Sequence, residues 1–196
     1  MIVTMIRHGK TPGNLLKQYI GRTDQSLAEE GIAELQEIAA SDSFLSRLQP
    51  ETVTRIYVSP MKRCQESATI LFPKAEQIIC EDLREMDFGI FEEKNYKDLE
   101  DSREYDEWVK SYCTSKIPDG EDKAGFSRRS CDAFLKCLED NEGKEEICFL
   151  VHGGTIMSVL EAYGEPEKEY YQWYAENGHG YRAIWKNGKL TQVEPV

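Results

Sequence analysis

Two of the three histidines in this 196-residue chain stand where an apolar run ends and a glycine follows. His8 lies in Arg7-His8-Gly9-Lys10-Thr11, after the run Met1 to Ile6. His152 lies in His152-Gly153-Gly154, after the run Ile147 to Val151. A neutral imidazole nitrogen can attack phosphorus, and a phosphohistidine intermediate divides phosphoryl transfer into two easier steps. The two histidines are therefore candidates for nucleophilic or phosphate-binding chemistry.

The cationic and acidic groups that such a transfer needs occur elsewhere in the chain. Arg7 precedes the first histidine, and Arg63 falls in the first turn of a predicted helix, whose positive end also attracts anions. Arginine suits a phosphoryl group because its planar fork makes two parallel hydrogen bonds. Glu85 has apolar neighbours, which would raise its pKa by desolvation. A carboxylic acid that is protonated near neutral pH can protonate a departing oxygen.

Each of these residues also has an ordinary structural explanation. His152 before two glycines can mark a strand-to-helix turn, Arg63 can be an exposed helix residue, and Glu85 a solvated loop acid. Their combination in a chain with few histidines favours the chemical interpretation, and the third histidine, His179, is expected in a turn. No metal site is predicted, because no H-x-H or H-E-x-x-H spacing occurs and the six cysteines are not grouped with histidines. The cysteines are expected to be reduced core residues.

The elements that must position these groups alternate between strand and helix. Strands are expected at 1–6, 53–58, 77–80 and 147–151, and helices at 27–40, from Ser59-Pro60 to about Leu71, 126–138 and 155–163. Ser59 is predicted to be the N-cap of the second helix. This order favours an α/β fold, a three-layer sandwich whose largely parallel central sheet has helices on both faces. Ligands bind beyond the carboxyl ends of such strands, where Arg7-His8, Ser59 to Arg63 and His152 should meet.

Residues 86–124 differ from the rest in being polar and acidic. Within them Tyr105, Trp108, Val109 and Tyr112 repeat at helical spacing. We expect a helical cap inserted into a single domain that spans residues 1–196. Two last strands are expected at 181–185 and 190–193, joined by the turn Asn187-Gly188.

The net charge of −12 excludes a broad nucleic-acid-binding surface. It arises in three segments, 92–107, 139–146 and 165–176, with net charges of −5, −4 and −3, whereas residues 1–25 and 52–65 each carry +3. An anion site is therefore expected where the positive segments meet. The longest apolar runs are too short to span a membrane, and the N-terminus lacks signal-peptide character, so a cytoplasmic location is expected.

The motifs together resemble the histidine phosphatase superfamily, also called the phosphoglycerate mutase-like family. Arg7 to Thr11 with Asn14 resembles its signature, and Gly21 to Leu27 the segment that follows. Ser59 to Arg63 with Ser67-Ala68 resembles the second-arginine motif, Leu83 to Gly89 the acid-donor segment, and His152 to Gly154 the second-histidine motif. The matches run in family order from residue 2 to about 160.

The resemblance implies roles for individual residues. His8 would be the phosphorylated nucleophile, and Glu85 would protonate the leaving group and later activate water. Arg7, Asn14, Arg63 and His152 would bind the phosphoryl oxygens. Neither a metal nor a cofactor is implied. Five further residues are candidates for substrate binding: Thr11, Gly21, Arg22, Thr23 and Gly153.

The expected activity is hydrolysis of a small phosphomonoester. The segment between Glu85 and His152 is short for the family, whereas mutases usually carry longer insertions that shield phosphohistidine from water. The motifs look most like the α-ribazole phosphatase branch. Two alternatives stay open, namely phosphoglycerate mutase-type transfer and a non-catalytic relative that binds phosphorylated ligands. Departures from the family, such as Glu92-Glu93 for Glu-Gly, Val151 for Ser or Thr, and Pro118 to Asp122 for Pro-x-Gly-Glu-Ser, concern substrate contacts. The oligomeric state is not predicted.

Overall fold

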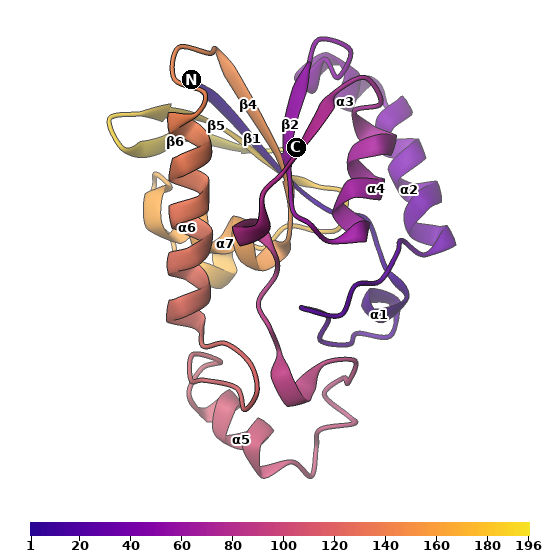
Figure 1. The fold of residues 1–196 in the computed structure, drawn as a ribbon, viewed down its shortest axis with the longest axis vertical. Helices are drawn as coiled ribbons and strands as arrows, with labels where there is room; N and C mark the ends of the chain where they lie inside the picture. The colour runs from indigo at the N-terminus through magenta and orange to yellow at the C-terminus, as the bar shows by residue number, and fades with distance from the viewer.

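A six-stranded sheet in the order β3-β2-β4-β1-β5-β6 forms the centre of the computed structural model, which describes all residues from 1 to 196 (Figure 1). Four strands run parallel: β1 (Ile2–Arg7), β2 (Arg55–Val58), β3 (Glu76–Ile79) and β4 (Glu146–Val151). β5 (Gly180–Lys186) and β6 (Lys189–Pro195) form an antiparallel hairpin beside β1. The expected largely parallel sheet is confirmed, and the predicted hairpin forms one of its edges.

Helices cover both faces of this sheet, because neighbouring residues of a strand point to opposite sides. Met5 and Phe149 pack into one apolar cluster with α6 (Lys123–Glu139) and α7 (Gly153–Tyr163). Ile6 and Leu150 pack into another with α2 (Glu29–Ala40), α3 (Asp42–Leu48) and α4 (Lys62–Leu71). The three-layer α/β sandwich is therefore confirmed. None of the helices combines the length and apolar character that a membrane-spanning segment needs.

Residues 86–124 form the expected helical cap at one end of the molecule (Figure 1). Met86, Phe91, Leu99, Trp108 and Ile117 build a small apolar cluster there with Phe126 of α6. The cap contains a 3-10 turn (Gly89–Phe91) and the helix α5 (Arg103–Lys110). α5 stops before Tyr112 because Tyr112 and Cys113 have φ of 56° and 59°, outside the helical region.

Two features of the α2–α4 layer differ from prediction. α3 gives no clear periodic signal, because only Phe44 and Leu48 of its seven residues are buried. α4 begins at Lys62 with Met61 at the N-cap position, so the prediction of Ser59 as N-cap was wrong. The Ser59 hydroxyl instead lies 2.7 Å from Nε2 of His152. The remaining short elements are α1 (Pro12–Leu15) and 3-10 turns at Glu81–Leu83 and Tyr170–Trp173.

Candidate active site

His8 directly follows β1 and exposes only 4% of its surface. Its Nδ1 lies 2.7 Å from the carbonyl oxygen of Gly9. Because a carbonyl oxygen only accepts, Nδ1 carries the proton and Nε2 keeps its lone pair. Burial and the positive charges of Arg63 and Arg7 lower the pKa of His8 well below its usual value. The ring is thereby held as a neutral imidazole whose Nε2 is suited to nucleophilic attack.

Arg63 is completely buried in the first turn of α4. Its Nη1 donates to the carbonyl oxygen of Thr23 at 2.9 Å, and its Nη2 to that of Gly21 at 2.9 Å. The buried Nε has no hydrogen-bond partner in the protein. A buried charge with an unused donor is costly unless an anion completes it. Arg63 is therefore oriented by backbone oxygens and retains capacity for a ligand.

Arg7, beside His8, is held in a similar way. Its Nη1 donates to the carbonyl oxygen of Ala175 at 2.9 Å, and its buried Nε has no partner. Asn177, two residues beyond Ala175, donates from Nδ2 to the carbonyl oxygen of His8 at 3.0 Å. The loop 174–180 thus holds the backbone of His8 and the guanidinium of Arg7 in place.

Asn14 lies in the short helix α1, where Thr11 is the N-cap. Its Oδ1 accepts from the amide of Thr11 at 3.1 Å and from Nδ2 of Asn177 at 3.3 Å. These bonds leave Nδ2 of Asn14 as a donor. The hydroxyl of Thr11 accepts from the amide of Asn14 and the whole residue is buried, so Thr11 shapes the loop around the site.

His152 is fully buried at the N-cap position of α7. Its ring centroid lies 5.2 Å from that of His8, with the ring planes inclined at 68°. Burial lowers its pKa well below the usual value, and the charge of Arg63 adds to this effect. The carboxyl end of β4 therefore brings a second neutral imidazole to the same place as the first.

Glu85 approaches the start of α7 from the other side. Its Oε1 accepts from the amide of Met86 at 3.0 Å and its Oε2 from that of Gly154 at 3.2 Å. A Cβ on residue 154 would stand 2.4 Å from Oε1, so only glycine permits this approach. A Cβ on Gly153 would contact Nε of Arg7 at 3.4 Å. Burial raises the pKa of Glu85, although the two amides favour its carboxylate form. A raised pKa is what a proton donor requires.

Glu92 links the cap to the segment that holds Arg63. Its two oxygens accept from the amides of residues 21–23 and from the Thr23 hydroxyl, at 2.7 to 3.2 Å. The side chain of Arg22 is exposed and reaches Asp87 of the cap at 3.4 Å. Among the predicted substrate-binding residues, Gly21 and Thr23 thus contact Arg63 through their backbone, and Arg22 contacts the cap.

An aromatic pocket of about 210 Å³ opens above Arg7, Glu85 and the glycines of α7. Lys123, one of its lining residues, pairs with Glu161 at 2.9 Å and lies over the ring of Tyr170. The other walls of this aromatic pocket are large apolar or aromatic side chains and one thiol: Tyr19, Met86, Phe88, Trp108, Cys113, Met157, Tyr170, Tyr171 and Tyr174. The space beside Arg7 and Glu85 therefore has an apolar character.

Sequence reasoning missed several residues around the site. Asn177 lies in a segment interpreted only as a turn, and Glu92 was noticed only as part of a departure from the family pattern. The tyrosines of residues 170–174 follow no helical or strand period. The aromatic density of Tyr-Tyr-Gln-Trp-Tyr is the one signal that could have pointed to a binding wall.

Comparison with solved structures places the fold in a class of α/β phosphatases. The α-ribazole phosphatase from Shigella flexneri superposes with a TM-score of 0.82 at 24% identity, covering 97% of this chain and 94% of that one. A phosphoserine phosphatase variant from Entamoeba histolytica in complex with phosphoserine gives a TM-score of 0.78 at 26% identity, covering 98% and 95%.

The family itself is defined by the sequence. The model of the histidine phosphatase superfamily (branch 1) matches residues 3–194, so the chain belongs to this superfamily, and the resemblance of its motifs is confirmed. Among curated proteins, "Probable phosphoglycerate mutase GpmB" of Yersinia pestis is 28% identical over 167 residues, covering 81% of this chain and 74% of that protein. The superfamily thus includes relatives named for hydrolysis and for transfer.

Proposed function

We propose that the protein is a phosphomonoesterase that hydrolyses a small phosphorylated metabolite through a phosphohistidine at His8. One observation carries the proposal: a buried neutral His8 lies beside Arg7 and Arg63, whose buried Nε atoms have no partner. Unsatisfied donors around a nucleophile suit a phosphoryl group, whose oxygens accept fixed hydrogen bonds. Membership of the histidine phosphatase superfamily and the phosphatase neighbours support the same reaction class.

The reaction would take two balanced steps. In the first, Nε2 of His8 bonds to phosphorus while the bond to the ester oxygen breaks, and Glu85 gives its proton to that oxygen. The alcohol leaves neutral, and Glu85 becomes a carboxylate. In the second step water attacks phosphorus, the phosphorus–nitrogen bond breaks, and Glu85 takes the proton of the water. Inorganic phosphate leaves, and His8 and Glu85 return to their starting states.

The charge that develops on the phosphoryl oxygens would be met by this chain's own side chains. Arg7 and Arg63 supply positive charge, and Asn14 and His152 supply further donors. The proposal includes no metal or cofactor, so hydrolysis of p-nitrophenyl phosphate should continue in excess chelator. A cytoplasmic setting is part of the proposal, in keeping with six cysteines that are all free thiols.

The aromatic pocket indicates the chemistry of the alcohol. Six aromatic rings line it, and Lys123 is already paired with Glu161. Such walls favour a flat apolar ring, because rings stack and because a paired lysine offers little to a carboxylate. The favoured substrate is therefore α-ribazole phosphate, whose benzimidazole is a ring of this kind. The resemblance of the motifs to the α-ribazole phosphatase branch points the same way.

A matched pair of substrates tests this proposal. Ribose 5-phosphate carries the same sugar phosphate as α-ribazole phosphate but lacks the ring. We expect kcat/KM to be higher for α-ribazole phosphate by about tenfold or more. The reason is that a well-packed ring contributes at least the binding free energy that corresponds to a tenfold change in affinity. Equal values would overturn the substrate assignment and leave hydrolysis standing. Failure to hydrolyse either sugar phosphate or p-nitrophenyl phosphate would overturn the phosphatase itself.

Mutase-type transfer is the second candidate, favoured by the 28% identity to the curated mutase-named protein. It would need 3-phosphoglycerate to bind with its carboxylate beside the phosphate site. Incubation of the enzyme with 3-phosphoglycerate and a 2,3-bisphosphoglycerate primer tests it, with 2-phosphoglycerate measured by NMR. Formation of 2-phosphoglycerate faster than hydrolysis of any ester would favour the mutase over the phosphatase.

A further inference from the structure

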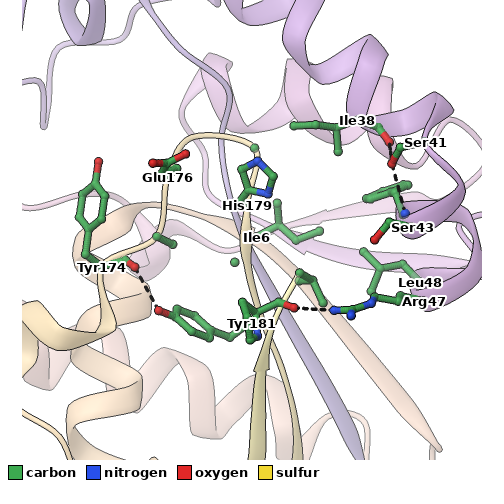
Figure 2. A pocket seen from close by; sticks show the side chains of 16 residues that line it. Ile6, Ile38, Ser41, Ser43, Arg47, Leu48, Tyr174, Glu176, His179 and Tyr181 are labelled. Atoms are coloured by element: carbon green, nitrogen blue, oxygen red, sulfur yellow. Dashed lines mark hydrogen bonds between the residues drawn. The ribbon is translucent and has the colours of Figure 1, made fainter.

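A second cavity, of about 470 Å³, which we call the rear cavity, is lined by residues on both sides of Asn177 (Figure 2). It is lined by α2, α3, the loop 174–180 and the end of β6, and Ile6, Ile38, Phe44 and Leu48 give it an apolar wall. Of the residues that line the aromatic pocket, only Tyr174 also lines this rear cavity. Its volume lies within the range of about 300–1,000 Å³ that is usual for small-molecule sites.

The mouth of the rear cavity is acidic. The cavity continues into a neighbouring hollow through shared residues that include Ile38 and Glu176. In that hollow Lys10 is paired with Glu34 at 2.6 Å, whereas Glu37 and Glu176 have no ion-pair partner. At the far end, Arg47 donates to the carbonyl oxygen of Pro195 at 2.8 Å (Figure 2). An apolar interior therefore opens towards the carboxylates of Glu37 and Glu176, with Lys10 nearby, and the guanidinium of Arg47 lies at the opposite end.

The loop 174–180 separates the rear cavity from the candidate active site and contacts both. On the active-site side, Ala175 accepts from Arg7, and the Gly178 amide donates to the carbonyl oxygen of Arg7 at 3.0 Å. On the cavity side the loop packs tightly, since a Cβ on Gly178 would stand 2.7 Å from Cδ1 of Ile38. A ligand that shifts the loop would therefore shift Arg7 and the backbone of His8.

We propose that the rear cavity binds a small molecule with a flat apolar body and a protonated amine, and that its occupation changes phosphate binding at His8. The apolar body would fill the space between Ile6, Ile38 and Phe44. The amine would lie at the mouth, where Glu37 and Glu176 supply the complementary charge. The same carboxylates would disfavour a ligand of equal shape that carries an anion.

Three probes that share an indole ring test the charge preference. Tryptamine carries an amine, tryptophol a hydroxyl and indole-3-acetate a carboxylate. Titration calorimetry should give the tightest binding for tryptamine, with a Kd of about 1 mM or below for a ligand of this size, weaker binding for tryptophol and the weakest for indole-3-acetate. Equal affinities for tryptamine and indole-3-acetate, or no binding of any probe, would overturn the proposal.

Variants locate the bound probe. Ser43 is an exposed lining residue of α3, so Ser43→Trp should fill the cavity and abolish tryptamine binding. Glu37→Gln should weaken tryptamine about threefold or more and leave tryptophol unchanged. Glu30→Gln, an exposed position of α2 outside the cavity, is the matched control. Tryptamine binding that persists in Ser43→Trp and competes with p-nitrophenyl phosphate would assign the probe to the aromatic pocket instead. If Ser43→Trp does not fold, Glu37→Gln decides alone.

Coupling between the two sites has its own measurement. Saturating tryptamine should change the inhibition constant of inorganic phosphate at least about threefold in the wild type and not in Ser43→Trp. By reciprocity, phosphate should change the Kd of tryptamine by the same factor, which calorimetry measures without any turnover. Binding that leaves phosphate affinity unchanged in both directions would overturn the coupling.

Discussion

The candidate phosphate site, formed by Arg7, His8 and Arg63, adjoins the aromatic pocket, but the two are held in place by different forces. Arg7, His8 and Arg63 are fixed by carbonyl oxygens of the backbone, those of Ala175, Gly9, Gly21 and Thr23. The pocket walls are fixed by ring packing, with the Tyr19 ring centroid 5.2 Å from that of Phe88 and 5.6 Å from that of Trp108. Backbone anchoring survives changes in the side chains of the anchoring residues themselves, whereas ring packing does not. The chemistry and the substrate preference should therefore respond to different substitutions.

The largest expected effect belongs to the nucleophile. His8→Ala removes the nitrogen that would attack phosphorus, so hydrolysis of p-nitrophenyl phosphate should fall by about 10⁴ or more. Phosphate should still bind, because Arg7 and Arg63 remain. Turnover that survives this substitution would sink the phosphohistidine mechanism. A wild-type protein that binds phosphate without turning over any ester would instead support the non-catalytic alternative.

The proton donor should show a leaving-group dependence. Glu85→Gln keeps the shape but cannot give up a proton, so an alkyl phosphate should react about 10²–10³ times more slowly. p-Nitrophenyl phosphate should lose much less, because its leaving oxygen needs no proton. The ratio is measured as kcat/KM on both esters, because this constant reports the first step and not the hydrolysis of phosphohistidine, in which Glu85 also acts. An equal loss on the two esters would contradict the assignment of Glu85 as the acid.

Loss of the contact between Glu92 of the cap and residues 21–23 should affect every substrate alike. Glu92→Gln replaces one accepting oxygen by a donor, which disturbs the residues 21–23 that hold Arg63. We expect kcat/KM to fall about tenfold for both α-ribazole phosphate and ribose 5-phosphate. Glu93→Gln, next to it and exposed, is the control. A loss confined to one substrate would place Glu92 in the pocket's selectivity rather than in support of Arg63.

A smaller and selective effect is expected from the pocket wall. Tyr171 lines the pocket and is 61% exposed, so Tyr171→Ala should leave the fold intact. Loss of one stacking surface should lower kcat/KM for α-ribazole phosphate about threefold to tenfold and leave ribose 5-phosphate unchanged. Tyr112→Ala, which changes an 85% exposed ring outside the pocket, is the matched control. Parallel losses on both substrates would argue against a separate specificity wall.

The smallest expected effect concerns the pH dependence of kcat/KM. The pKa of His8 is lowered, so the nucleophile stays neutral below the ordinary value of about 6.5. The pKa of Glu85 is raised, so the acid keeps its proton above the ordinary value of about 4.3. After correction for ionisation of the substrate, kcat/KM should therefore not fall as the pH decreases through about 6.5. An acid limb at pH 6.5 or above would show that His8 is not held neutral.

The same contrast explains what could be predicted from the sequence. β1 and β4 are largely apolar runs that are followed by histidine and glycine, so the strands and their chemical residues are predicted together. Arg63 was found because a helix start follows a strand. Each of these signals is local. The pocket wall has no local signal, since Tyr19, Trp108 and Tyr171 come from three distant segments that only the fold brings together.

Ser59 and Asn177 show a second limit. In the sequence, Ser59 stands before proline and a lysine-arginine pair, which is typical of a helix N-cap. In the structure, its hydroxyl instead lies 2.7 Å from Nε2 of His152. Asn177 sits in a glycine-containing turn, where its amide reaches the His8 backbone. Short polar side chains serve caps, turns and sites equally well, and only their three-dimensional neighbours decide among these uses.

Trp108 gives this molecule an optical property. Of the three tryptophans, Trp173 and Trp185 pack into or against the main core, and only Trp108 lines the aromatic pocket, with an indole nitrogen that has no partner. Its emission should therefore respond when a ring enters the pocket, while the other two supply a constant background. Occupancy of the pocket can thus be followed by intrinsic fluorescence, without a label and without turnover.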